Sequence, residues 1–99
     1  MIRHTVAFKL KHSSGSESES SFLKAAQVLT SIPSVRNFEW LRQVSPKNNF
    51  AFGFSMEFAS QQDYEAYNIH PEHVRFVETR WKSEVADFLE IDYVPFVPV

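Results

Sequence analysis

The sequence predicts an α+β domain in which four antiparallel strands form one sheet and helices cover one of its faces. Residues 50–58 read Phe-Ala-Phe-Gly-Phe-Ser-Met-Glu-Phe, with large apolar side chains on one parity and small or polar ones on the other. Successive strand side chains point to opposite faces, so this segment is a strand with a heavy and a light face. Residues 2–11 alternate in the same way, and segments of helical periodicity separate the strands.

The remaining strands are predicted from shorter patterns. Residues 35–44 form a second strand, and the turn residues 45–49 join it to the Phe-rich strand as an antiparallel hairpin. Leu89, Ile91 and Tyr93 alternate as a final strand. Pro95 and Pro98 exclude the tail, residues 94–99, from a regular ladder, and we expect this apolar tail to lie on a surface, such as that of a neighbouring subunit.

The helices are predicted from apolar stripes and end signals. A first helix covers residues 17–31, ends before Pro33, and spaces its apolar residues at i, i+3, i+4 and i+7: Phe22, Ala25, Ala26 and Leu29. A second, short helix opens at Ser60 and breaks at Asn68. A third begins at Pro71 and continues to about Asp87, with the stripe Val74, Val77, Trp81, Val85 and Phe88.

This order of elements, strand, helix, strand, strand, broken helix, strand, is typical of the ferredoxin-like βαββαβ fold. The helices then cover the heavy face of the sheet and leave the light face bare. That face carries the small residues Thr5, Ala7, Gly53 and Ser55. Because small side chains allow another sheet to approach closely, the light face predicts a homodimer.

Composition limits the class of protein. A chain of 99 residues fits one domain, residues 1–99, and its net charge of −2 argues against nucleic acid as a partner. We expect no membrane span and a cytoplasmic location, with which the absence of cysteine agrees. The two glycines form no phosphate-binding loop, so no cofactor is predicted. An aromatic share of 15% indicates a thick core, an interface or a pocket for an apolar ligand.

Several segments resemble the stress-responsive dimeric α/β-barrel domain (Dabb) family. Residues 2–11, 35–46 and 52–58 resemble its first three strands. Residues 67–73, Tyr-Asn-Ile-His-Pro-Glu-His, resemble its Tyr-x-x-His-Pro-x-His signature, and Asp92-Tyr93 matches its Asp-Tyr ending. The resemblance implies a homodimer in which two sheets pack face to face as a barrel.

The resemblance also implies candidate site residues. Some relatives are polyketide cyclases, which close a ring by aldol condensation in a cavity between sheet and helices. There a His of the third helix is the base and a Tyr of the short helix assists it; His73 and Tyr67 occupy these positions. His4 matches a pocket-lining His of the first strand, whereas a further cyclase His is replaced by Phe52. The expected pocket residues are His4, Phe22, Phe52, Phe54, Phe76 and Trp81.

The residues themselves leave three interpretations of His73. In the first, His73 forms a hydrogen bond with Tyr67 or the backbone and stabilises the helix break. In the second, His73 is a general base and the hydroxyl of Tyr67 is the donor beside it. Alternatively it binds a metal with His70 and a carboxylate, but Pro71 interrupts the spacing and no third ligand is assigned, so no metal is predicted. His4, as the polar member of a heavy face, also fits a strand end with one ring nitrogen bonded to backbone or water.

Three functions follow, and whether the protein is an enzyme stays open. The first is binding of a small hydrophobic or aromatic ligand between sheet and helices. The second is a cyclase-like lyase that uses His73 as base and Tyr67 as donor. The third is a structural, stress-protective oligomer whose core is filled. The volume of the space between sheet and helices distinguishes the first two functions from the third.

Overall fold

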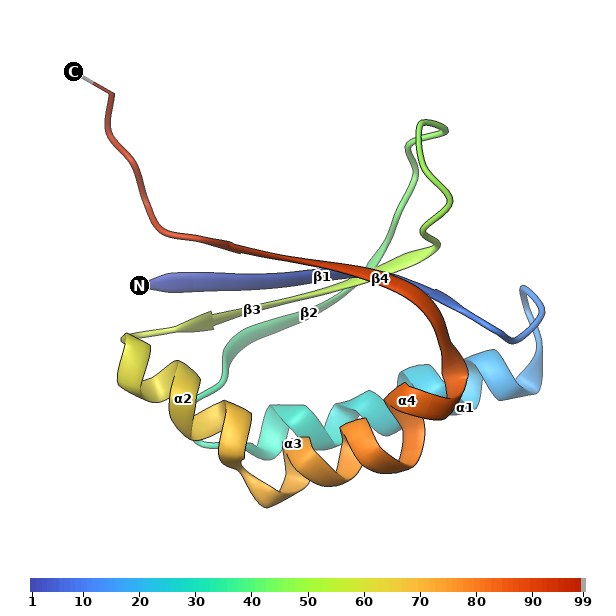
Figure 1. Cartoon of the computed structure of the whole chain (residues 1–99), viewed down its shortest axis with the longest axis horizontal. Helices are drawn as coiled ribbons and strands as arrows, with labels where there is room; N and C mark the ends of the chain where they lie inside the picture. The colour runs from blue at the N-terminus through green and yellow to red at the C-terminus, as the bar shows by residue number, and fades with distance from the viewer. Residues whose placement is uncertain (99) are drawn as a thin grey trace.

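In the computed structural model, which describes residues 1–98, one sheet lies over one layer of helices (Figure 1). The strands are β1 (Ile2–Leu10), β2 (Arg36–Arg42), β3 (Phe52–Phe58) and β4 (Val85–Tyr93). They are ordered β2-β3-β1-β4, and every neighbouring pair is antiparallel. The predicted ferredoxin-like fold is therefore confirmed. Among residues 1–98, no helix has the length and apolar character needed to cross a membrane.

The helical layer is built from short, capped pieces. The predicted first helix consists of α1 (Glu17–Ala25) and the 3₁₀ segment η1 (Ala26–Ser31). The broken helix consists of α2 (Gln61–Ile69), α3 (Pro71–Phe76), the π-helical segment η2 (Val77–Trp81) and α4 (Lys82–Glu84). The side chains of Ser16 and Ser60 accept hydrogen bonds from the first turns of α1 and α2. His70 caps α3, and Pro71 occupies its first turn.

The heavy face of the sheet and the helices enclose the core. Phe8, Phe54 and Phe58 are at most 2% exposed and belong to one core cluster with buried helix residues such as Phe22. Val6 lies opposite Phe54 and Phe8 opposite Phe52, so β1 and β3 present their large residues to the same side. Burying each Phe contributes roughly 1.5–3 kcal/mol, so this face accounts for much of the stability.

The predicted end of the third helix is wrong. The helix ends at Glu84, not near Asp87, and Val85 and Phe88 belong to β4. The backbone N–H of Lys11 donates to the carbonyl oxygen of Glu84 over 2.8 Å, and Leu10 pairs with Val85. Pairing with β1 therefore makes residues from Val85 onward a strand, although Val85 and Phe88 continue the apolar spacing of the helix.

The reverse face of the sheet is more apolar than its row of small residues predicts. Ala7 lies opposite both Gly53 and Leu89, and Thr5 lies opposite Ile91. In this single chain Leu89 and Ile91 are 50% and 40% exposed. The tail after β4 runs away from the sheet (Figure 1), and the described part of it is largely exposed.

Candidate functional site

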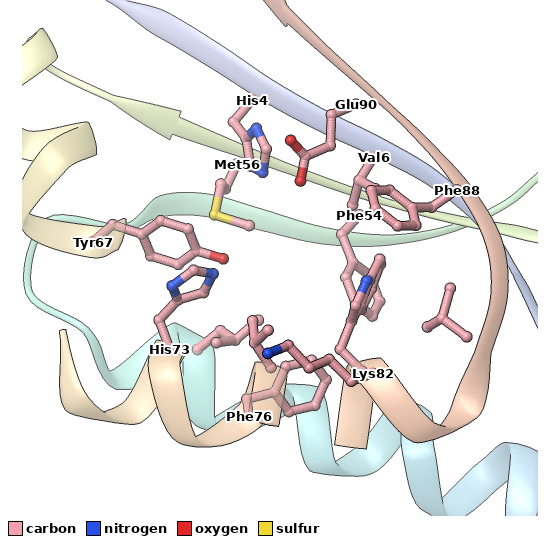
Figure 2. Close-up of a pocket in the computed structure, with 14 residues that line it drawn as sticks. His4, Val6, Phe54, Met56, Tyr67, His73, Phe76, Lys82, Phe88 and Glu90 are labelled. Carbon is pink, nitrogen blue, oxygen red and sulfur yellow. The ribbon is translucent and has the colours of Figure 1, made fainter. Parts of the chain in front are cut away.

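A cavity of about 500 Å³ lies between the heavy face of the sheet and the helices (Figure 2). Strands β1, β3 and β4 provide one wall, and η1 and the segments from α2 to α4 provide the other. Most of the lining is apolar and includes Val6, Leu29, Met56 and Val77. Its polar members are His4, Tyr67, His73, Lys82 and Glu90. The cavity therefore combines an apolar interior with a small set of polar side chains.

Six of the eight residues predicted for the site meet at this cavity: His4, Phe54, Tyr67, His73, Phe76 and Trp81. Phe22 and Phe52 do not line it, which corrects the predicted pocket. Phe22 is fully buried behind the lining, with its ring centroid 5.5 Å from that of Phe76 and 6.1 Å from that of Trp81. Phe52 lies towards the other end of β3, where the Arg42 guanidinium is 5.1 Å from its ring.

His4 is held by a carboxylate and lies at the cavity. Its Nδ1 is 2.6 Å from Oδ1 of Asp92, and the Tyr64 hydroxyl lies 2.9 Å from the same nitrogen. The Tyr64 hydroxyl donates to Oδ2 of Asp92 over 2.8 Å. Since a carboxylate only accepts, Nδ1 of His4 carries the hydrogen. The partner of this buried His is thus a side chain of β4, not the backbone or water that the strand-end interpretation expects.

His73 has the same tautomer for a similar reason. Its Nδ1 lies 3.0 Å from the carbonyl oxygen of Asn68, to which it donates. This bond ties α3 to the end of α2, as the structural interpretation of His73 expects. Burial lowers the pKa of His73 below its usual value of 6.5, which favours the neutral ring with an unprotonated Nε2. The same contact therefore stabilises the helix break and leaves Nε2 of His73 able to accept a hydrogen bond.

Tyr67 lies beside His73, with 4.2 Å between the ring centroids. It is 3% exposed, and burial raises the pKa of its hydroxyl well above the usual value of 10.0. The hydroxyl consequently stays protonated and able to donate. Figure 2 shows Tyr67 and His73 at the same end of the cavity as His4, with Phe54 and Phe88 at the other end.

His70 does not join His73 at this site. Its Nδ1 accepts a hydrogen bond from the backbone N–H of Glu72 over 3.1 Å, so the side chain caps α3. Within residues 1–98, no group of three or more His, Cys, Asp or Glu side chains is placed to hold a metal ion. The described geometry thus gives the metal interpretation of His73 no support.

Comparison with known proteins assigns this chain to a family. The family model described as the stress responsive A/B barrel domain, Dabb, matches residues 2–95. The chain belongs to the Dabb family. Among curated proteins, none matches the chain.

Solved structures agree with this assignment. The chain is 58% identical to a Dabb family protein with a ferredoxin-like fold from Mesorhizobium loti, with a TM-score of 0.95 and 97% of each chain covered. A dimeric ferredoxin-like protein of unknown function from Thermobifida fusca is 19% identical, with a TM-score of 0.78 and coverage of 95% of this chain and 90% of that one. Hydroxynitrile lyase from Passiflora edulis is 15% identical, with a TM-score of 0.84 and coverage of 99% and 95%. At these identities the last two show only a shared fold.

The predicted site of this Dabb protein omitted several lining residues, of which Glu90 and Phe88 are the most informative. Phe88 and Glu90 alternate with Leu89 and Ile91, so their parity places them on the helix side of the sheet once β4 is known to begin at Val85. The predicted site omitted them because the third helix was predicted to continue to about Asp87. The pairing of His4 with Asp92 has no local signal, because the two residues are 88 positions apart in the chain.

Proposed function

We propose that this Dabb protein binds a small hydrophobic or aromatic ligand in the cavity between its sheet and helices. The observation that carries the proposal is the cavity itself, about 500 Å³ with a mainly apolar lining and a few polar side chains. Small-molecule sites of proteins typically enclose roughly 300–1,000 Å³ and have this kind of lining.

Aromatic rings at one end of the cavity favour a flat apolar ligand. The Trp81 ring lies 5.6 Å from that of Phe88 and 6.4 Å from that of Phe54, both in tilted or edge geometry. Such rings offer faces and edges to a further aromatic group. The third function, an oligomer with a filled core, is disfavoured because the predicted aromatic residues leave the space open.

Nuclear magnetic resonance tests this proposal, because the chain has two tryptophans and one of them lines the cavity. Added β-naphthol is expected to shift the indole N–H resonance of Trp81 and to leave that of Trp40 in place. Val77→Phe narrows the cavity and should abolish the shift. Val74→Phe, three residues earlier in the adjoining α3 and outside the lining, is the matched control and should preserve it. Binding that survives Val77→Phe unchanged would argue against the cavity as the site.

A second candidate function is proton transfer next to a carbonyl, as in a cyclase-like lyase. Nε2 of His73 removes the proton, and the Tyr67 hydroxyl donates to the enolate oxygen that forms. The observation that favours this function is the neutral tautomer of His73, whose Nδ1 is already occupied by the carbonyl of Asn68, beside a protonated Tyr67.

Deuterium exchange tests the second function without knowledge of the substrate. In D₂O the protein should speed exchange of the protons next to the carbonyl of phenylacetone. His73→Asn should reduce this rate by about 10²-fold or more, the usual contribution of a general base. His70→Asn is the matched control, because Asn also caps helices and His70 does not line the cavity. Equal rates in wild type and His73→Asn would exclude His73 as the base.

The proposed assembly is a homodimer in which the reverse face of the sheet meets the same face of a second copy. Exposed Leu41, Leu89 and Ile91 surround the small residues Ala7 and Gly53 on this face, which gives it an apolar centre suited to sheet-to-sheet contact. The description of the Thermobifida fusca protein as dimeric supports the proposal of a dimer.

A further inference from the structure

We infer that the ligand of this cavity carries a hydroxyl group at its polar end, and that the cavity selects a phenol or alcohol over the matching ether or carboxylate. The inference rests on the proposed function and adds the chemical class of the ligand. It follows from which atoms at the polar end of the cavity accept hydrogen bonds and which donate them.

His4 offers an acceptor to the cavity. Its Nδ1–H is used by Asp92, because an unprotonated Nδ1 at 2.6 Å from a carboxylate oxygen would place two acceptors in contact. The neutral ring has one N–H, so Nε2 carries the lone pair. His4 is buried at the wall of the cavity and extends from β1 towards Tyr67 and His73 (Figure 2), which leaves Nε2 for a ligand in the cavity.

His73 offers a second acceptor by the same logic. Its Nδ1–H is used by the carbonyl oxygen of Asn68, which accepts and never donates. Nε2 is again the unprotonated nitrogen, and burial of the ring disfavours a second proton. Two imidazole rings from different elements, β1 and α3, therefore present lone pairs to the same end of the cavity.

The other polar groups leave acceptors in excess of donors at the polar end of the cavity. Glu90, on β4, adds a carboxylate to the same wall and can only accept while ionised (Figure 2). Nζ of Lys82 lies 2.7 Å from Oε1 of Glu78, so this donor has an anionic partner outside the lining. The Trp81 ring belongs to the aromatic end. The Tyr67 hydroxyl both donates and accepts.

A hydroxyl group of the ligand can both donate to these acceptors and accept from the Tyr67 hydroxyl. Its hydrogen donates to Nε2 of His4 or His73, and its oxygen accepts from Tyr67. A carboxylate would instead face two lone pairs and the charge of Glu90, and an ether has no hydrogen to donate. A ligand without a donor would displace water from the two imidazole nitrogens and leave them without a hydrogen bond, which costs free energy. Protein sites reject ligands of similar shape in this way. An ammonium group fits less well, because its desolvation requires a buried anion and Glu90 is exposed.

Three naphthalenes of nearly equal size test the inference on the wild-type protein: β-naphthol, its methyl ether and β-naphthoate. Titrations followed at the Trp81 indole resonance should give a dissociation constant about tenfold lower for β-naphthol than for the other two, the change typical of one hydrogen bond. Equal affinity for the ether, or tighter binding of the naphthoate, would overturn the inference and leave the proposed function intact. Failure of all three to bind would overturn the proposed function and the inference together.

Asp92→Asn tests the part played by the His4 tautomer. The amide of Asn can donate to Nδ1, which moves the ring hydrogen to Nε2 and turns this acceptor into a donor. In Asp92→Asn the preference for β-naphthol should then shrink, and β-naphthoate should bind more tightly. Asp87→Asn lies on the same strand, where Asp87 pairs with Lys9 and not with His4, and it should change neither the preference for β-naphthol nor the affinity for β-naphthoate. Nitrogen resonances of the imidazole rings report the tautomers directly, and a proton on Nε2 of both rings in the wild type would overturn the inference.

Discussion

His4 on β1 and Asp92 on β4 lie opposite each other in the strand register, and Nδ1 of His4 donates to Oδ1 of Asp92 over 2.6 Å. The other carboxylate oxygen of Asp92 accepts from the hydroxyl of Tyr64 on α2. A single carboxylate on an edge strand of the sheet thereby orients a buried imidazole and ties a helix to the sheet. The network fixes both the tautomer of His4 and the position of its ring at the cavity.

Asp92→Ala should lower the free energy of unfolding. The change removes the acceptor of the His4 ring, which is buried, and that of the Tyr64 hydroxyl. Loss of partners for such groups typically costs about 1–3 kcal/mol, and the 41% exposure of the Asp92 side chain places the expected value in the lower half of that range. Urea denaturation measures it.

Asp87→Ala serves as the control for this change. Asp87 lies on the same strand, and its side chain accepts from the neighbouring backbone N–H of Phe88. Exposed substitutions of this kind usually change stability by less than about 0.5 kcal/mol. Equal destabilisation by the two variants would contradict the role given to Asp92.

The stability of the protein should fall as the pH drops through the titration of His73. Burial lowers the pKa of this ring from 6.5 in the folded protein, and the charged or titratable groups that act on it are His4, His70 and Glu90. The unfolded chain therefore binds the proton first. The contribution of His73 is fully present above pH 6.5 and is lost as the pH falls towards the lowered folded value.

Urea unfolding between about pH 7.5 and about pH 5.5 measures this dependence, and His73→Gln should reduce its slope. A titration of the His73 ring by NMR provides the independent check. A midpoint at or above 6.5 in the folded protein would contradict the effect assigned to burial.

Leu89→Arg should convert the proposed dimer into monomer or aggregate. The guanidinium would have to be buried without a partner between two apolar sheet faces, which is strongly unfavourable. Leu89 tests the interface better than Gly53, where a Cβ atom would lie 3.3 Å from the carbonyl oxygen of Val6 and disturb the sheet itself. Ile69→Arg, at a residue that is 78% exposed on α2, is the control. Sedimentation velocity separates the species, and an unchanged dimer in Leu89→Arg would exclude this face.

Phe8→Ala should destabilise the fold more than the other substitutions proposed here. The Phe8 ring is fully buried and lies within 6 Å, between centroids, of the rings of Phe22, Phe54 and Trp81. Removal of such a ring costs about 3–5 kcal/mol. Phe96→Ala, at a tail residue that is 84% exposed, should change the free energy of unfolding by less than about 0.5 kcal/mol in the monomer.

Local patterns were sufficient for most of the fold and for part of the site. Alternation in residues 2–11 and 50–58 predicts two strands, because the faces of a strand follow directly from the parity of its residues, and these are the central strands β1 and β3. The motif of residues 67–73 placed Tyr67 and His73 at the helix break, where the structure brings them to the cavity. The end of the third helix could not be predicted in this way, because Val85 and Phe88 are three positions apart and fit the helical stripe. In β4 both line the cavity only because the pairing with β1 shifts register between Lys9 and Leu10.

The sequence by itself determined the order of elements, the heavy and light faces of the sheet and the family. The order of elements and the two faces depend on residue spacing, which is local and periodic, and the family rests on the resemblance of several segments and of the motif at residues 67–73. Only the tertiary structure decided that Asp92 would hold His4, that Glu90 would enter the cavity, and that Phe22 and Phe52 would lie outside it. Such relations depend on the register between β1 and β4 and on the packing of the helices over the sheet, which join residues far apart in the chain.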